Sequence, residues 1–457
     1  MKAEEEEKQV GIQAKISMNA NALCAWSSAK DEPRWLLEHR IRALELAGTL
    51  ELPKVEKIKL EKWDIYESGD YKAENAWSGL EDAPEVVRGL VASPVEGGLI
   101  VQINSDVVYT ELSADLAAQG VILTDLHTAA KEHEELVQRY LFQAVKPEEH
   151  RLSAVHSALW SGGVFLYVPD GIEVEAPIQA IFYSDTSGAL FAPHILIVTG
   201  NNSKISYVDH CISRRDDIKV LHNGVVEVFA GAGSKVQVAS VHQLAAATTD
   251  FTQRRAVVLA DGGVEWIVGE MNDGYTASDT KTLLQGNGSI SDAKVIAVGS
   301  GDQKLSCTTQ AQHFGRSSVS QMITRAVMRE EATAIINGIT KIEKGATHCD
   351  GQQTERVLML SPNARGDANP ILLIDEDDVT AGHAASVGQV NAEQIYYLMS
   401  RGISRSEAEY LVIFGFLAPV ISEIPLVGVR SRLQDVVEKK LGRSQGIRAN
   451  QSEAYEG

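Results

Sequence analysis

Short apolar runs that recur between glycine- and asparagine-rich turns dominate residues 161–378 of this 457-residue chain. Apolar and polar side chains alternate within these runs, and helical periodicity is nearly absent. The turns resemble one another, and the first three return about every 30 residues: Gly-Asn-Asn-Ser at 200–203, Gly-Ala-Gly-Ser at 231–234, Asp-Gly-Gly at 261–263, Gly-Asn-Gly-Ser at 286–289 and Gly-Ser-Gly-Asp at 299–302. Such a chain can fold as a sandwich, a barrel or a solenoid.

The recurrence of similar turns favours a solenoid over a β-sandwich. One coil of a β-helix cannot bury its inner face alone, so coils stack and similar turn chemistry returns at each of them. Hairpin signals are weak, with Asn223-Gly224 as one example. A stacked β-helix has end coils with unpaired strand edges, which can pair with another chain. We expect the apolar run 371–374 to lie in the last coil and to form such a seam, with Ile371 and Leu373 as contacts.

The first third of the chain is expected to be mixed α/β. Pro33 opens an amphipathic helix that ends at Gly48, 54–63 is predicted as an exposed strand or arm, and 124–145 as a long helix with Thr124 as its N-cap. Three histidines are predicted on solvated helix surface and as poor ligand candidates: His127, His133 and His150. We divide the chain into a mixed α/β domain with a mobile acidic lead (1–158), a β-helix core (159–388) and a C-terminal helical domain with a polar tail (389–457).

The charge pattern bears on partners and location. The formal net charge is −20, which argues against binding nucleic acid or anionic membranes, since both need a Lys/Arg surface. No apolar run approaches the roughly 20 residues of a membrane span. Residues 4–7 are all Glu, where a signal peptide would carry basic residues. The sequence predicts a cytoplasmic protein.

The four cysteines stand far apart, at Cys24, Cys211, Cys307 and Cys349. No C-x-x-C or C-x-x-H spacing is present, so no self-contained zinc or iron–sulfur site is visible. Walker, nucleophile-elbow and Rossmann glycine motifs are absent as well, so ATP hydrolysis by this chain is not expected. Each cysteine alone is typical of a buried small apolar residue.

The segment from 375 to 417 is expected to lead from a strand into two helices. The acidic set 375–378 is followed by small residues at 381–388, which predict a loop with His383 at its centre. Asn391 is a predicted N-cap, Gly402 a helix end, and Ser404 the cap of a second helix that Pro419 closes. The helices carry more apolar surface than a small appendage can bury, which predicts docking of a partner; the proposed contacts are Tyr397, Arg401, Ile403, Tyr410 and Phe414.

Three groups of residues could carry chemistry. A neutral imidazole such as His383 is a good iron ligand, and a nearby carboxylate can fix its tautomer; a bond to Asp377 or Asp378 that merely stabilises the turn is the alternative. In the 348–350 run His-Cys-Asp, Cys349 is a weaker candidate for handling sulfur, because neighbours on a strand point to opposite faces. Asp375 and Asp377 could act as paired carboxylates of a β-helical carbohydrate-active enzyme, or bind calcium, although no aromatic residue stands near them.

Residues 377–408 resemble the C-terminal end of the SufB/SufD family of iron–sulfur cluster assembly proteins. The likeness rests on Asp-Asp-Val, the small residues around His, Val-Gly, and then Glu-Gln-Ile-Tyr-Tyr-Leu-x-Ser-Arg-Gly-Ile-Ser with Glu-Ala. It is stronger to SufD than to SufB, and it extends more loosely over 153–441. It implies a right-handed parallel β-helix and a non-enzymatic scaffold subunit.

The resemblance also implies partners and a site. A SufB-like β-helix protein would pair along the last coils, and SufC, an ABC-type ATPase, would bind the C-terminal helices. His383 matches a functional histidine of the family, so iron or a transient Fe–S cluster would be shared with the partner and not held by this chain alone. Some relatives carry a cysteine two residues before that histidine, where this chain has Ala381. A purely structural adaptor remains a third hypothesis.

Overall fold

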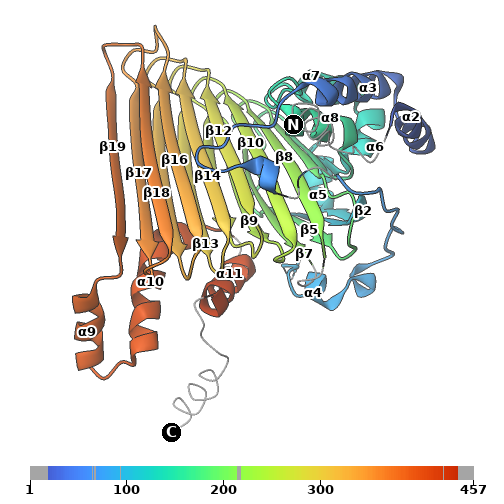
Figure 1. Ribbon diagram of the computed structural model, residues 1–457. Coiled ribbons are helices and arrows are strands. Elements are labelled where there is room, and N and C mark those ends of the chain that lie inside the picture. The colour runs from blue at the N-terminus through green and yellow to red at the C-terminus, as the bar shows by residue number, and fades with distance from the viewer. Residues whose placement is uncertain are drawn as a thin grey trace, which may run out of the picture.

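The computed structural model describes residues 19–63, 65, 68–92, 94–213, 218–425 and 427–440. These residues form a mainly β structure built around a parallel solenoid, with helices toward both ends (Figure 1). The prediction of a β-solenoid is therefore confirmed, and the sandwich is excluded. The acidic lead and the polar tail fall in 1–18 and 441–457, outside the described residues.

Two sheets make the walls of the solenoid. Sheet 1 contains, in spatial order, β19 (Thr380–Gln389), β17 (Asp350–Met359), β15 (Val319–Met328), β13 (Ile290–Gly299), β11 (Gly263–Glu270), β9 (Lys235–Gln243), β7 (Lys204–Ser213), β5 (Ile178–Ser184), β1 (Gly98–Ile103) and β2 (Asp106–Leu112). Sheet 2 contains β18 (Arg365–Ile374), β16 (Thr333–Ile342), β14 (Lys304–His313), β12 (Thr276–Leu284), β10 (Thr248–Val258), β8 (Val220–Ala230), β6 (His194–Thr199), β4 (Val164–Val168) and β3 (Ile122–Thr124).

Successive strands alternate between the sheets from β4 onward, so each coil gives one strand to each wall. Val319 pairs with Asp350, and Asp350 pairs with Thr380. Stacking explains why the turn residues repeat. Gly233 and Gly288 have φ of +68°, and a Cβ at either would lie 2.3 Å from a side-chain oxygen of the turn one coil earlier, Asn202 and Asp261 respectively. Only glycine fits both the backbone angle and the close approach.

The N-terminal part packs helices and an extended segment against the solenoid. Its helices are α2 (Ala20–Ala29), α3 (Arg34–Thr49), η1 (Leu60–Lys62), η2 (Leu80–Asp82), α4 (Glu85–Arg88), α5 (Ala114–Ala118), α6 (Leu126–Glu132), α7 (Glu134–Tyr140) and α8 (Arg151–Leu159). After α3 the chain crosses the outer face of sheet 2 (Figure 1). Leu60 and Trp63 are buried there against Leu221 and Phe251. Of the predicted exposed strand or arm at 54–63, the structure shows an arm and no strand; its lysines are exposed, but its apolar side chains cover the sheet.

Two further N-terminal predictions are corrected. The long helix at 124–145 is instead two short helices, α6 and α7, and Asp125 is the N-cap, accepting from Thr128 N at 3.0 Å. The three histidines do not lie on solvated surface. His127 stacks on Trp160 with 4.5 Å between ring centroids, His133 is half-buried near Phe165, and His150 caps α8. Burial lowers the pKa of His127 and takes that of His150 to about 4.

In the described part of the chain, three helices follow the solenoid: α9 (Ala392–Ser400), α10 (Arg405–Ile421) and α11 (Val427–Lys440). The predicted caps Asn391 and Ser404 are confirmed, and Gly402 has φ of +88°. Pro419 lies inside α10 and does not close it. Side chains of α10 and α11, such as Leu417 and Leu433, pack on the outer face of sheet 1. Among the described helices, none is long and apolar enough to cross a membrane.

Candidate site at the last coil of the solenoid

Strand β19 forms the last edge of sheet 1, and its outer backbone groups have no neighbouring strand in the described chain. Thr380 N donates to Cys349 O at 2.8 Å. Since N–H and C=O groups alternate in direction along a strand, the groups of Ala381, His383, Ala385 and Val387 face the open side. This edge carries no proline, so its hydrogen-bonding pattern is complete. It is a template for one more strand.

Strand β18 is the corresponding edge of sheet 2, and it contains the run 371–374. Arg365 N donates to Ala332 O at 2.9 Å, so the odd-numbered residues bond to β16. The backbone groups of Ile371 and Leu373 therefore point inward along the sheet, and those of Leu372 and Ile374 face the open edge. Pro370 also stands on the open side, where a missing N–H breaks no bond within the chain.

The residues at 381–388 form a strand and not the loop that was predicted. Small residues have little intrinsic preference for strands, and here pairing with β17 decides the conformation. His383 lies beside Gln353 in register, and paired residues in a parallel sheet face the same side. Gln353 is 2 % exposed inside the solenoid. His383 is exposed and lies on the inward-facing side of the terminal strand.

Glu355 is a buried carboxyl group just beneath this edge, and sequence reasoning missed it. It is 1 % exposed, two residues beyond Gln353 on the same face of β17, and its Oε2 has no hydrogen-bond partner in the described part of the chain. Gly338 leaves space for it, because a Cβ there would lie 1.9 Å from Glu355 Oε1. Burial raises the pKa of Glu355 to about 7. Its burial could have been predicted from the sequence, because alternate residues of 351–357 face the interior of the solenoid and Glu355 is one of them.

Cys349 is buried under the same coil and separated from His348. Its Sγ lies 3.1 Å from Ser318 Oγ, which lies 2.8 Å from His313 Nδ1. His348 is exposed and its Nδ1 lies 3.1 Å from Asp378 Oδ2. The two neighbours therefore do not form one site. Of the other thiols, Cys211 and Cys307 are buried with raised pKa, and Cys24 is half-buried.

The acidic set 375–378 lies in the connection between β18 and β19. Strand alternation therefore does not bring Asp375 and Asp377 together, which corrects the basis of the carbohydrate-enzyme hypothesis. Both side chains are exposed. Glu376 Oε2 instead accepts from Gly345 N at 2.9 Å, so this carboxylate ties the connection to the preceding turn.

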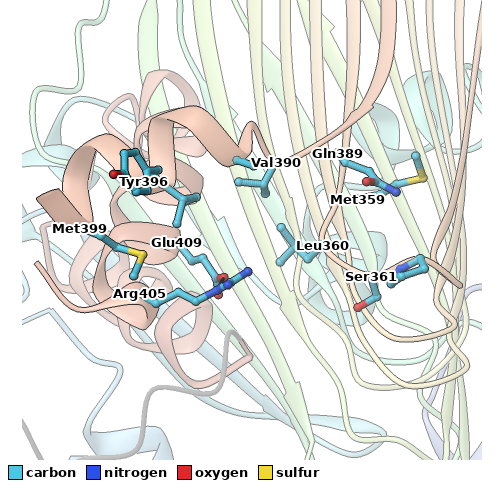
Figure 2. Close-up of a pocket in the computed structure, with 12 residues that line it drawn as sticks. Met359, Leu360, Ser361, Gln389, Val390, Tyr396, Met399, Arg405 and Glu409 are labelled. Carbon is cyan, nitrogen blue, oxygen red and sulfur yellow. Dashed lines mark hydrogen bonds and ion pairs between the residues drawn. The ribbon is translucent and has the colours of Figure 1, made fainter.

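A groove of about 590 Å³ lies between α9, α10 and the turn after β17 (Figure 2). Tyr396, which is 74 % exposed, and Met399, 42 % exposed, line it together with the Arg405–Glu409 ion pair. The predicted docking residues lie close by but differ in exposure. Tyr397 is exposed and carries Arg401 over its ring at 5.2 Å; Ile403 is half-buried; Tyr410 stacks on Phe414, which packs partly against the helix–sheet core.

Comparison with known proteins assigns the family. Residues 182–416 match the family described as SUF system FeS cluster assembly, SufBD core domain, and residues 91–180 match the SufBD protein N-terminal region. The chain belongs to the SufBD family. It is 43% identical to the iron-sulfur cluster assembly protein SufD of Bacillus subtilis, over 93% of this chain and 99% of the relative. Identity to SufB of the same organism is 26%, over 88% of each chain.

A SufBD family protein of Staphylococcus epidermidis is also 26% identical, over 90% of each chain. Within the SufBD family this chain is therefore most like SufD, as the motif at 377–408 indicated.

We expect Glu355→Gln to stabilise the chain at alkaline pH. The folded carboxyl has a pKa of about 7 against an ordinary value of 4.5, so the folded state keeps a proton that the unfolded chain releases. The free energy of unfolding then falls as pH rises through that window. At pH 8 the variant should gain about 3 kcal/mol over the parent chain, with no gain below pH 4.5. Thermal unfolding across pH measures this. Exposed Glu393→Gln is the control, and equal pH profiles for the parent and Glu355→Gln would contradict the expectation.

Proposed function

We propose that this chain is the SufD-like subunit of a cytoplasmic scaffold that assembles iron–sulfur clusters and has no enzymatic activity of its own. It pairs with a SufB-type solenoid through the open edges of β18 and β19 and docks a SufC-type ATPase on its C-terminal helices. Membership of the SufBD family supports the assembly role. The observation that carries the pairing is the complete, unprotected backbone pattern on β19.

The proposed metal-handling site is His383 with Glu355 beneath it. Imidazole and carboxylate both suit iron, and the raised pKa of Glu355 lets it give up its proton when a cation arrives. Thiolates for a cluster come from the partner, because Ala381 stands beside His383 on the inward face. The cluster or iron is therefore cargo shared across the seam.

The docking groove is mechanically coupled to this seam. Only residues 390 and 391 separate the end of β19 at Gln389 from the start of α9 at Ala392. The same groove is lined by Gln389 and Val390 and by Tyr396 and Met399 of α9 (Figure 2). A force applied to α9 by an ATPase therefore reaches β19 directly. We propose that nucleotide-driven closure of the ATPase strains the paired edges and opens the site around His383.

Replacing His383 by alanine in the assembled complex tests the site. We expect the three-component complex to form normally and its iron affinity and cluster yield to fall at least ~10-fold, because a ligand is lost. His348→Ala is the matched control, since His348 is an exposed histidine at the rim of the preceding coil. Unchanged iron binding and cluster yield in His383→Ala would remove His383 from the mechanism.

The two alternatives predict different results. A structural adaptor forms the complex without any effect of histidine or cysteine substitutions on cluster yield. A carbohydrate-active enzyme using Asp375 and Asp377 acts as a purified chain on its own. Co-purification from cell extract, followed by metal analysis of the recovered complex, distinguishes these two functions from the scaffold.

A further inference from the structure

A second group of potential ligands lies inside the solenoid, in coils that precede the terminal one. Asp250 of β10 is fully buried, with Oδ1 2.8 Å from His222 Nδ1 and Oδ2 2.7 Å from His242 Nδ1. The three ligand atoms lie within 4.8 Å of one another. Both histidines are also buried. Two imidazole nitrogens and a carboxylate therefore converge in a closed interior.

Glu270 supplies a fourth group aimed at the same point. It pairs with His242 in the register of β9 and β11, and its Oε2 lies 3.7 Å from His242 Nδ1. Glu270 Oε1 binds Arg254 at 3.2 Å, but Oε2 has no hydrogen-bond partner among the described residues, although the side chain is fully buried. An unpartnered carboxylate oxygen in a protein interior is costly and needs a cation or a donor.

The charges of this buried group also favour a bound cation. Among the described residues, one permanent cation contacts this group: Arg254, which lies 3.2 Å from Glu270 Oε1 and 3.1 Å from His242 Nε2. Asp209, a third buried carboxyl, accepts from Ser240 Oγ at 2.7 Å at the edge of this group. Buried carboxylates need compensating positive charge. The guanidinium balances one of the two carboxylates, so the other requires a bound cation or a proton on an imidazole.

We propose that His222 Nδ1, His242 Nδ1, Asp250 and Glu270 bind one divalent first-row transition-metal ion. Imidazole with carboxylate is a donor set that suits Fe²⁺, Zn²⁺, Mn²⁺ or Co²⁺. The surrounding groups already orient the ligands: Asn272 Nδ2 donates to Asp250 Oδ2 at 2.8 Å and Thr252 Oγ1 to Asp250 Oδ1 at 2.7 Å. Such hydrogen bonds to a ligand carboxylate are typical of metal sites.

Binding requires both imidazoles to release the proton from Nδ1. His242 then carries its proton on Nε2 and donates it to Ser240 Oγ at 3.2 Å. The hydrogen bond from Arg254 Nη2 to Nε2 is given up, and Arg254 keeps its bonds to Ser240, Ser278 and Glu270. Ser240 Oγ also lies 3.2 Å from Arg254 Nη2 and can accept from both groups. The ion would join β8 and β10 of sheet 2 to β9 and β11 of sheet 1, and so stabilise the solenoid. This inference does not depend on the role proposed for His383.

The test uses the full-length chain, purified without chelator and without a histidine tag. We expect about one equivalent of transition metal by elemental analysis, or one equivalent of Co²⁺ after refolding with that ion. Bound Co²⁺ should give visible d–d absorption without a thiolate charge-transfer band, and X-ray absorption should find imidazole and oxygen donors. Absence of any stoichiometric ion in both preparations would overturn the proposal and leave a proton on His242 as the balancing charge. A thiolate band would overturn the assigned ligands.

Two nearly isosteric variants address the individual ligands. Asp250→Asn and Glu270→Gln should each lower Co²⁺ affinity by about 100-fold or more, whereas His194→Gln should not. His194 is equally buried and lies 3.1 Å from a carboxylate, that of Glu227, outside the four donors. Parental affinity in both folded ligand variants would overturn the assignment. If the variants fail to fold, the spectra of the parent chain still decide the donor set.

Discussion

Replacing Ala385 by proline is expected to abolish pairing with a SufB-type partner while the solenoid stays folded. The backbone N–H of Ala385 faces the open side of β19, so no bond within the chain is lost. Proline removes a donor from the edge and obstructs an incoming strand. The expected loss is about 3 kcal/mol or more in pairing, or ~100-fold in affinity. Titration of the two purified proteins measures it.

Ala384→Pro is the matched control for this prediction. Its N–H points toward β17, so proline there breaks a ladder bond inside the chain and should destabilise the fold by about 1–3 kcal/mol. Ala385→Pro therefore tests the open edge of β19, whereas Ala384→Pro shows the effect of breaking a hydrogen bond within the fold. Normal partner binding by Ala385→Pro would show that β19 is not the pairing edge.

Replacing Met399 by aspartate is expected to abolish docking of the ATPase. Met399 lines the groove between α9 and α10 and is 42 % exposed. A carboxylate there would have to be buried when a helix or loop fills the groove, and Arg405, which also lines the groove, is already paired with Glu409. We expect a loss of at least ~100-fold in affinity, with no change in the stability of the free chain. Calorimetric titration with a SufC-type ATPase measures it.

Leu411→Asp is the control for the groove. Leu411 is similarly exposed, at 44 %, and lies on α10 but does not line the groove. Its replacement should leave ATPase binding near the parental value. Equal losses in both variants would contradict docking in this groove and assign binding to the wider helical surface.

The solenoid and its helical ends could be predicted from the sequence because their causes are local. The repeated turns require glycine at positive φ against the preceding coil, as at Gly233 and Gly288, and this requirement is visible as a repeat. The caps Asn391 and Ser404 bond to backbone groups within three residues. The family motif at 377–408 is likewise continuous in the chain.

Only the tertiary structure shows which side chains of different coils lie next to one another. Residues 381–388 form a strand because β17 pairs with them, although their own composition predicts a loop. Glu355 becomes a buried carboxyl with a raised pKa because Gly338, on the opposite wall, leaves it space. His222 pairs with Asp250 and His242 with Glu270, each one coil apart, but the two pairs lie in different sheets and only the folded solenoid brings them together. Turns and caps depend on residues that are close in the sequence. The side chains that meet inside the solenoid depend instead on how coils of about 30 residues stack, and only the folded chain defines the registers of that stacking.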